Sequence, residues 1–270
     1  MLGGVRPRPV VVLGIGVLLL LAASPWLTGA DPLKLSVPDR LKPPSLLHLF
    51  GTDDFGRDVF ARVAHGARLS LLIGFLVTSL ATLLGAAIGL AAGFFKRADP
   101  FLARLLDAMM AFPDILLAVA LMAAFGQNLG NVVVALGLVY APRVARVVRA
   151  STLAQRGTLF VEAAQSMGAG NLRALLVHVL PNILPVLFVQ ATFVFAYALL
   201  TESALSFLGV GVPPEVPTLG NMIAAAQLYL DDATWLILFP GAAIALSVLC
   251  LQMVGDGLRD ALDPILRGAE

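Results

Sequence analysis

The stretch Leu69–Phe95, LSLLIGFLVTSLATLLGAAIGLAAGFF, is a run of 27 residues without a charged side chain. A bilayer crossing needs about 20 predominantly apolar residues, so this run is long enough to span a membrane as one helix. Soluble domains carry roughly 25% charged residues, whereas this chain carries 13% and is 59% hydrophobic. The sequence therefore predicts an all-α, polytopic membrane protein.

Other uncharged segments on both sides of this run predict further crossings. Val10–Ala30 is a run of 21 uncharged residues, and Val179–Thr201 and Ala233–Gly255 are runs of 23. The run Ile115–Pro142 contains the polar hexapeptide Gly126–Asn131, which is typical of a turn between two spans. We therefore expect six transmembrane helices, near residues 10–29, 70–94, 103–125, 131–149, 182–204 and 234–255.

The distribution of positive charge predicts the orientation of these helices. An even number of spans places both termini on one side of the membrane. If that side is the cytoplasm, twelve of the 18 Lys and Arg residues lie in cytoplasmic segments. The other six lie in the loop 31–68, where five Asp nearly balance them. Because cytoplasmic loops carry an excess of Lys and Arg, we expect both termini in the cytoplasm.

On this reading the chain has three parts and no separate soluble domain. Residues 1–30 form an N-terminal tail and the first transmembrane helix, and residues 31–68 form a periplasmic or extracellular loop. Residues 69–270 form a core of five transmembrane helices with a cytoplasmic loop at 150–181. An alternative is that a signal peptide ends at Thr28-Gly29-Ala30, although an uncharged run of 21 residues is long for one.

Several kinds of chemistry are absent from the sequence. None of the three lysines (Lys34, Lys42 and Lys96) fits the phosphate-binding pattern G-x-x-x-x-G-K-[ST], so the chain has no P-loop. It has no H-E-x-x-H motif, and its one cysteine and three histidines show no metal-ligand spacing. We therefore expect no metal, no cofactor and no ATP hydrolysis by this chain itself. The net charge of +1 gives no indication of nucleic-acid binding.

The loop 150–181 has the pattern of a short helix, a turn and a second helix. Thr158 is a plausible N-cap, and Leu159, Ala163 and Met167 then form one apolar stripe at helical spacing. A surface helix with such a stripe fits a groove in a partner protein. It fits equally well on membrane headgroups, and periodicity alone does not separate these two interpretations.

The turn and the second helix follow from the residues after this stripe. Gly168 and Gly170 tolerate positive φ and so allow the chain to turn. Asn171 is a candidate cap for the second helix. Pro181 is expected to kink or end that helix, because proline disturbs a helix interior.

Small and hydroxyl side chains in the span 70–94 are candidates for an interface or a pathway. Gly85, Gly89 and Gly93 lie four residues apart, so they share one helix face and allow another helix to approach closely. That helix belongs either to a partner subunit or gate, or to the same chain. Thr78 and Thr82 lie on roughly the same face and are candidates for a polar path.

The positions of the acidic residues near the spans bear on whether the chain is a proton-coupled carrier. Such a carrier needs an acid near the membrane midplane. Asp107, Asp114 and Asp256 are expected near the inner ends of their spans, and Glu202 near an outer end, so none is central. Glu202 either faces the outer mouth of a pathway or is a hydrogen-bonded residue between helices. Arg143 and Arg146 are expected in the last turns of the fourth span, from which arginines reach the headgroups.

The residues of the loop 150–181 resemble the EAA loop of ABC-importer permeases. The match covers Glu162, Ala163, Ala164, Gly168 and Leu180-Pro181, and it departs at His178, where the general pattern has Ile. Three further blocks, together with HVLPN at 178–182, resemble the dipeptide/oligopeptide/nickel permease family. These blocks are LHLFGTDDFGRDVFARVAHGAR at 47–68, ALSFLGVGVPPEVPTLGNM at 204–222 and GDGLRDALDP at 255–264.

This resemblance implies a function. It implies a permease subunit, of the C type, in an ATP-driven, binding-protein-dependent importer of the cytoplasmic (inner) membrane, for peptides or a related small solute. The implied partners are two ATPase subunits, a second homologous permease chain, an external solute-binding protein and membrane lipid. The alternatives are a proton-coupled carrier and a membrane scaffold without a pathway. The residues implied to couple to the ATPase are Glu162, Ala163, Ala164, Gly168, Asn171, Leu180 and Pro181.

Overall fold

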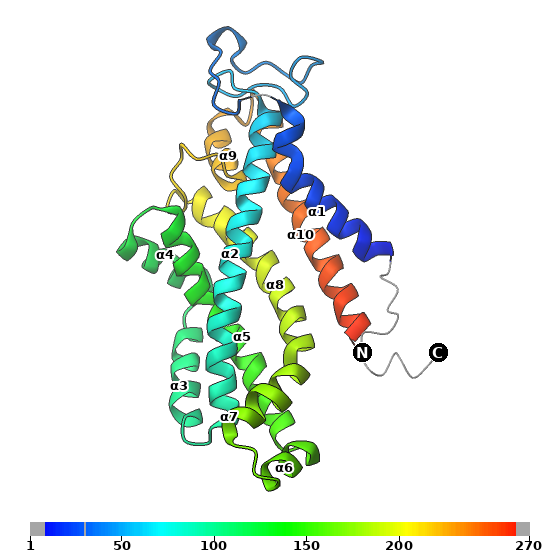
Figure 1. The fold of residues 1–270 in the computed structure, drawn as a ribbon. Coiled ribbons are helices and arrows are strands. Elements are labelled where there is room, and N and C mark those ends of the chain that lie inside the picture. Colours follow the sequence, from blue (N-terminus) through cyan, green and yellow to red (C-terminus); the bar gives the residue numbers. More distant parts are fainter. Residues whose placement is uncertain (1–8, 30, 263–270) are drawn as a thin grey trace.

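The structure is a computed structural model that describes residues 9–29 and 31–262. Arg6, Arg8 and Arg267, which the charge count assigns to the cytoplasm, lie outside these residues, as does Ala30 of the candidate cleavage site. The described part is built from helices, and its long helices run along one axis (Figure 1). These long helices are α1 (Pro9–Thr28), α2 (Val59–Phe94), α5 (Leu129–Arg156), α8 (Leu180–Phe207) and α10 (Trp235–Leu262).

Shorter elements connect the long helices. The two halves of a bent pair are α3 (Asp99–Met110) and α4 (Asp114–Phe125). One end of the molecule carries α6 (Leu159–Ser166), α7 (Asn171–Arg173) and the π-helical turn η2 (Ala174–Val179). The opposite end carries the segment before α2, with its 3₁₀ turn η1 (Val37–Asp39), together with α9 (Leu219–Ala226) and η3 (Gln227–Tyr229).

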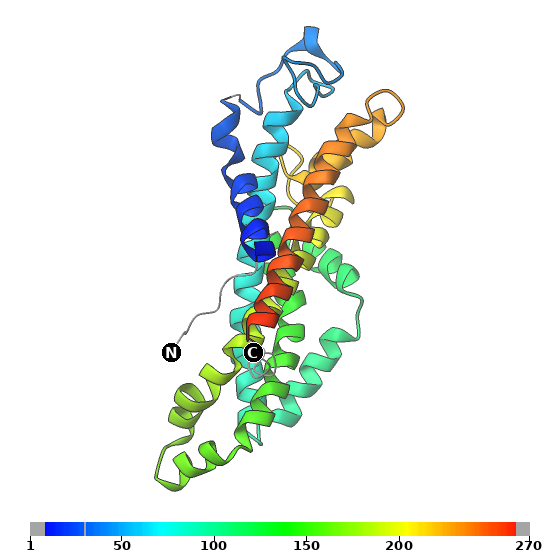
Figure 2. The same ribbon diagram turned by 90° about the vertical axis from the view of Figure 1, so that its right-hand side faces the viewer.

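The expectation of membrane-spanning helices is confirmed, with one correction. The described residues contain five helices that are long and apolar enough to cross a membrane, or six if the bent pair is one span. The expected span 103–125 is not continuous, because α3 and α4 meet at an angle of 90°. Pro113 explains the break: it has no N–H to donate and it disfavours helical geometry in the residue before it. The bend is visible in Figures 1 and 2.

Several helices extend beyond the spans that the sequence pattern predicts, α2 and α5 among them. α2 begins at Val59, ten residues before the uncharged run that starts at Leu69, and the Asp58 carboxylate caps it by accepting from Ala61 N at 2.8 Å. α5 continues to Arg156, which places Arg143 in the middle of a 28-residue helix. Arg143 therefore lies in the middle of its helix and not in its last turns, because the helix does not stop where the uncharged run stops.

The main core lies between α2, α5 and α8. α2 packs closely against α5, because three of its residues on the contact face are glycines. A Cβ added at Gly89 would lie 2.6 Å from Ala145 O and 2.7 Å from Val148 Cβ. Gly85 and Gly93 meet α5 in the same way, one turn earlier and one turn later. The glycine stripe therefore serves packing within this chain, which was one of its two interpretations.

Candidate functional site

The loop between α5 and α8 begins with a helix whose two faces differ sharply. Thr158 stands at the N-cap of α6 with extended backbone, but its hydroxyl donates to Gln155 O at 2.6 Å and does not cap the helix. Val161 and Ala164 are buried, and Val161 belongs to the main core together with residues of η2. The inner face of α6 thus anchors the helix to the rest of the chain.

The outer face of α6 carries the apolar stripe, which we call the α6 stripe: Leu159, Ala163 and Met167. Leu159 and Met167 are each 84% exposed, and Ala163 is also exposed. Figure 1 shows α6 at the far end of the molecule, beyond the turn that joins α2 to α3. Exposed apolar side chains at the tip of a loop are typical of a surface that meets a protein partner.

The turn after α6 depends on one glycine. Gly168 has φ of +92°, a region that residues with a Cβ rarely adopt, and no atom lies within 4 Å of where its Cβ would be. Its requirement for glycine is therefore conformational and not steric. Gly170 has φ of −64° and does not need this freedom. It also takes the N-cap position, so the expectation that Asn171 caps the second helix is wrong; the Asn171 side chain instead accepts from Gln165 Nε2 at 3.4 Å.

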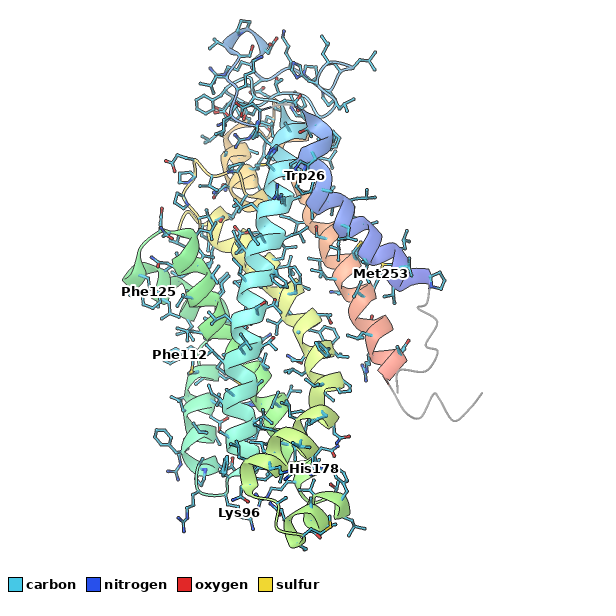
Figure 3. All side chains as sticks on the ribbon, in the orientation of Figure 1. Trp26, Lys96, Phe112, Phe125, His178 and Met253 are labelled. Carbon is cyan, nitrogen blue, oxygen red and sulfur yellow. The ribbon has the colours of Figure 1, made fainter. Side chains whose placement is uncertain are left out.

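The second helix does not stop at Pro181. α7, η2 and α8 run on without a break, and Pro181 lies in the first turn of α8. The π-helical turn Ala174–Val179 immediately before it shifts the hydrogen-bond register, which accommodates a residue without an N–H. Asn182 Nδ2 also donates to His178 O at 2.6 Å. His178 is labelled in Figure 3 close to the loop end of the molecule.

The residues implied to couple to an ATPase thus differ in how far they are exposed to solvent. Glu162 and Ala163 are exposed on the outer side of α6, whereas Ala164 is only 6% exposed and packs inward. Gly168 and Asn171 are exposed at the turn. Pro181 is exposed and Leu180 is half-buried, so these two lie at the start of the long helix that the loop leads into.

The candidates for a polar pathway do not form one among the described residues. Thr78 donates to Gly74 O of its own helix at 2.7 Å, and Thr82 Oγ1 is buried without a hydrogen-bond partner there. Glu202 is fully buried. Its carboxylate accepts from Ser206 at 2.9 Å and from Ser70 of α2 at 3.3 Å. Glu202 is therefore a hydrogen-bonded residue between helices, and it does not face an outer opening.

The block GTDDFGRD forms a closed loop at the opposite end of the molecule. The Asp53 carboxylate accepts from the backbone N–H of Phe55 and of Arg57, both at 2.9 Å, and from Arg57 Nε at 2.6 Å. Trp235 Nε1 of α10 donates to Thr52 O at 3.2 Å. These contacts hold the loop before α2 in one shape and tie it to the last helix.

A feature that sequence reasoning missed lies along α5. Three arginines spaced three residues apart each form an ion pair with an aspartate of the bent pair α3–α4, and we call these pairs the Arg–Asp ladder. Their spacing was the signal: three positive residues on one helical face, and three acids in the preceding segment. The pairs are Arg143 with Asp114, Arg146 with Asp107 at 2.7 Å, and Arg149 with Asp99 at 2.5 Å.

Comparison with known proteins identifies relatives of the whole chain. Residues 81–268 match the family described as the binding-protein-dependent transport system inner membrane component. A putative peptide transport system permease protein of Brucella suis is 50% identical over 257 residues, which cover 95% of this chain and 87% of that protein. The dipeptide transport system permease protein DppC of Alkalihalophilus pseudofirmus is 42% identical over 93% of this chain and 83% of its own length.

Two further comparisons extend this range. The glutathione transport system permease protein GsiD of Pectobacterium atrosepticum is 38% identical over 97% of this chain and 89% of its own length. Among solved structures, the inward-facing MetNI methionine ABC transporter aligns with a TM-score of 0.62 at 19% identity. That alignment covers 77% of this chain and 96% of the other chain. It shows that the two chains share a fold.

Proposed function

Because the chain belongs to the family of binding-protein-dependent transport system inner membrane components, we propose that it conducts peptides and takes its energy through the α6 stripe. The chain is a multi-pass inner-membrane permease subunit of an ABC importer and is not itself an enzyme. Such a permease works with ATPase and substrate-binding partners and a second permease.

The observation that carries the coupling proposal is the contrast between the two faces of α6. Its inner face is fixed to η2 through buried Val161, while Leu159 and Met167 on its outer face are exposed. A partner that binds the outer face can therefore move α6 as a rigid unit. Because η2 continues directly into α8, that movement reaches a membrane-spanning helix. The proposed partners are two ATPase subunits, and the second permease is a different, homologous chain.

The proposed orientation places α6 and both termini in the cytoplasm, where the ATPase subunits lie. Loop 31–68 and residues 209–232 are then external and available to a solute-binding protein. An Arg173→Cys variant should react with a membrane-impermeant thiol reagent from the cytoplasmic side only. Labelling from the outer side would contradict both the orientation and the coupling role of α6.

The substrate proposal rests on the relatives, two of which are named for peptide or dipeptide transport. The test is uptake of a labelled dipeptide into proteoliposomes that hold the complete transporter and its binding protein. Uptake should require ATP, and nickel or glutathione should not compete at equal concentration. Dipeptide uptake without ATP would favour a carrier instead, and competition by glutathione would assign a different solute.

The coupling proposal is tested by changing Leu159 to Gln. Burying a leucine contributes about 1.5–3 kcal/mol, so binding of the ATPase subunit should weaken about tenfold or more. The chain should still reach the membrane at normal levels, because the apolar spans direct insertion. Leu228→Gln is the matched control, since Leu228 is 85% exposed at the other end of the molecule. Equal loss of ATPase binding in both variants would contradict the proposal.

Gly168→Val tests the same contact without touching the stripe. Valine disfavours φ of +92°, so the turn should be displaced although no steric clash arises. Membrane levels should stay normal while ATPase binding and transport fall. Gly170→Val is the control, because φ of −64° suits any residue. Disappearance of the Gly168→Val protein from the membrane would show that this glycine serves folding instead.

A further inference from the structure

The Arg–Asp ladder consists of charged groups that are only partly covered by the chain. The Arg146 and Asp107 side chains are 52% and 69% exposed, and Arg143 and Asp114 are 37% and 31% exposed. The ladder therefore lies on a surface of the subunit. What that surface faces depends on its depth in the membrane.

The packing of α2 on α5 gives this depth. A Cβ at Gly85 would lie 2.7 Å from Ala141 O, so Gly85 is level with the turn of α5 that holds Arg143. Gly85 lies ten residues from Phe95, where the uncharged run ends, and ten residues of helix span about 15 Å. Half of a hydrocarbon core about 30 Å thick is the same distance. By this count Arg143 and Asp114 lie near the midplane, deeper than the inner-end position expected for Asp114.

The other end of the ladder lies at the membrane edge. A Cβ at Gly93 would lie 2.8 Å from Arg149 O, and Gly93 is two residues from Phe95. The ladder therefore runs from the edge of the apolar region to near its middle. Lipid tails offer no partner to charged groups at that depth, so such groups face a protein interior or a water-filled cavity.

We propose that the Arg–Asp ladder lines an aqueous route through the cytoplasm-facing half of the membrane, and that its arginines and aspartates bind the carboxylate and ammonium groups of a zwitterionic solute. This inference rests on the proposed function as a peptide importer. The route runs between this subunit and the second permease chain, which would shield the exposed sides of the pairs from lipid. Each end of a peptide then replaces one member of a pair, so no charge is left uncompensated in transit.

The surroundings of Arg143 suit this exchange. Its guanidinium lies 5.7 Å from the ring centre of Tyr140 and 5.3 Å from that of Tyr197, so aromatic faces stabilise the cation even when its aspartate is displaced. Tyr197 is 51% exposed on α8 and presents an apolar ring beside the charges. The site therefore offers a carboxylate-binding group and an aromatic surface at one position near the midplane.

The first test asks whether the ladder faces water. Ala111→Cys is placed four residues after Asp107 and three before Asp114, in a chain whose single cysteine is changed by Cys250→Ala. Ala87→Cys is the control, because Ala87 is exposed on α2 two residues from Gly85 and so lies at similar depth. The complete transporter is treated, nucleotide-free and trapped with vanadate, with a membrane-impermeant thiol reagent.

We expect the cysteine at position 111 to react from the cytoplasmic side in at least one of the two states, and the cysteine at 87 to react in neither. Reaction at neither position, or equal reaction at both, would overturn the inference. ATP-dependent uptake by the unmodified transporter is measured in parallel. Absence of that uptake would contradict the proposed function, whereas the labelling pattern bears only on whether the ladder faces water.

The second test asks whether the ladder touches the solute. Arg143→Gln should lower uptake of a dipeptide with a free carboxylate about tenfold, because a charge-assisted hydrogen bond is lost. Uptake of the corresponding dipeptide amide, also loaded to saturation on the binding protein, should change less than about twofold. Equal losses for both solutes, together with recovery in the Arg143→Asp, Asp114→Arg double variant, would mean that the pair serves folding only.

Discussion

The two sides of α5 are packed by opposite means. On one side Gly85, Gly89 and Gly93 of α2 bring the two backbones close together, with α5 side chains that include Thr152 packed against them. On the other side the Arg–Asp ladder joins α5 to the bent pair α3–α4 through long, partly exposed side chains. Backbone contact fixes one arrangement, because interiors are close-packed and tolerate little change. Ion pairs can exchange partners, so the second side suits a surface that changes with transport.

The largest effect on stability is expected when the space on the glycine side is filled. Gly89→Leu would drive a side chain into Ala145 O and Val148, so α2 and α5 would have to separate. We expect a loss of about 3 kcal/mol or more in unfolding free energy, measured by SDS titration in mixed micelles, and a much lower membrane level.

The control for this change lies on another helix. Gly16→Leu adds the same side chain at a glycine of α1 with no atom within 4 Å of its Cβ position. Its stability should change by less than about 0.5 kcal/mol. If the two variants behave alike, the close approach of α2 and α5 is not what holds the bundle together.

The sequence predicts the glycine side of α5 far better than the ladder side. The four-residue spacing of the glycines already indicates a close helix contact, although it does not say with which helix. The sequence does not predict the ladder, because the ladder depends on two features of the tertiary structure. Pro113 breaks the expected span, which Figure 3 shows at Phe112, and this places Asp114 beside Arg143. The continuation of α5 then carries its arginines into the apolar region.

At the end of the molecule that carries α6, too, the sequence predicts some features and misses others. Local rules gave the α6 stripe and the positive φ of Gly168, because spacing and backbone conformation are properties of a short segment. They failed at Asn171, and they did not show that the helix continues through Pro181, because both outcomes depend on how the following helix begins. The π-helical turn depends on how the chain packs around it, and no residue pattern in Ala174–Val179 predicts it.

A double-mutant cycle on Arg149 and Asp99 measures how strongly one ion pair of the ladder stabilises the fold. This pair is bidentate, with Arg149 Nε and Nη2 donating at 2.5 and 2.9 Å, and both side chains are less than one-third exposed. We expect a coupling free energy of about 1 kcal/mol in unfolding, at the upper end for partly exposed pairs. A coupling free energy as large as the loss of unfolding free energy expected for Gly89→Leu would mean that the two sides of α5 are equally rigid.

The smallest effect is expected at Arg146. Its pair with Asp107 is a single contact at 2.7 Å between side chains that are 52% and 69% exposed. Water or a solute can compensate either charge, so Arg146→Gln should lower the unfolding free energy by less than about 0.5 kcal/mol. Yet its place between Arg143 and Arg149 in the ladder means that uptake of a charged dipeptide should still fall severalfold. Stability loss without a change in uptake would make this pair a structural tie and would remove the middle of the proposed route.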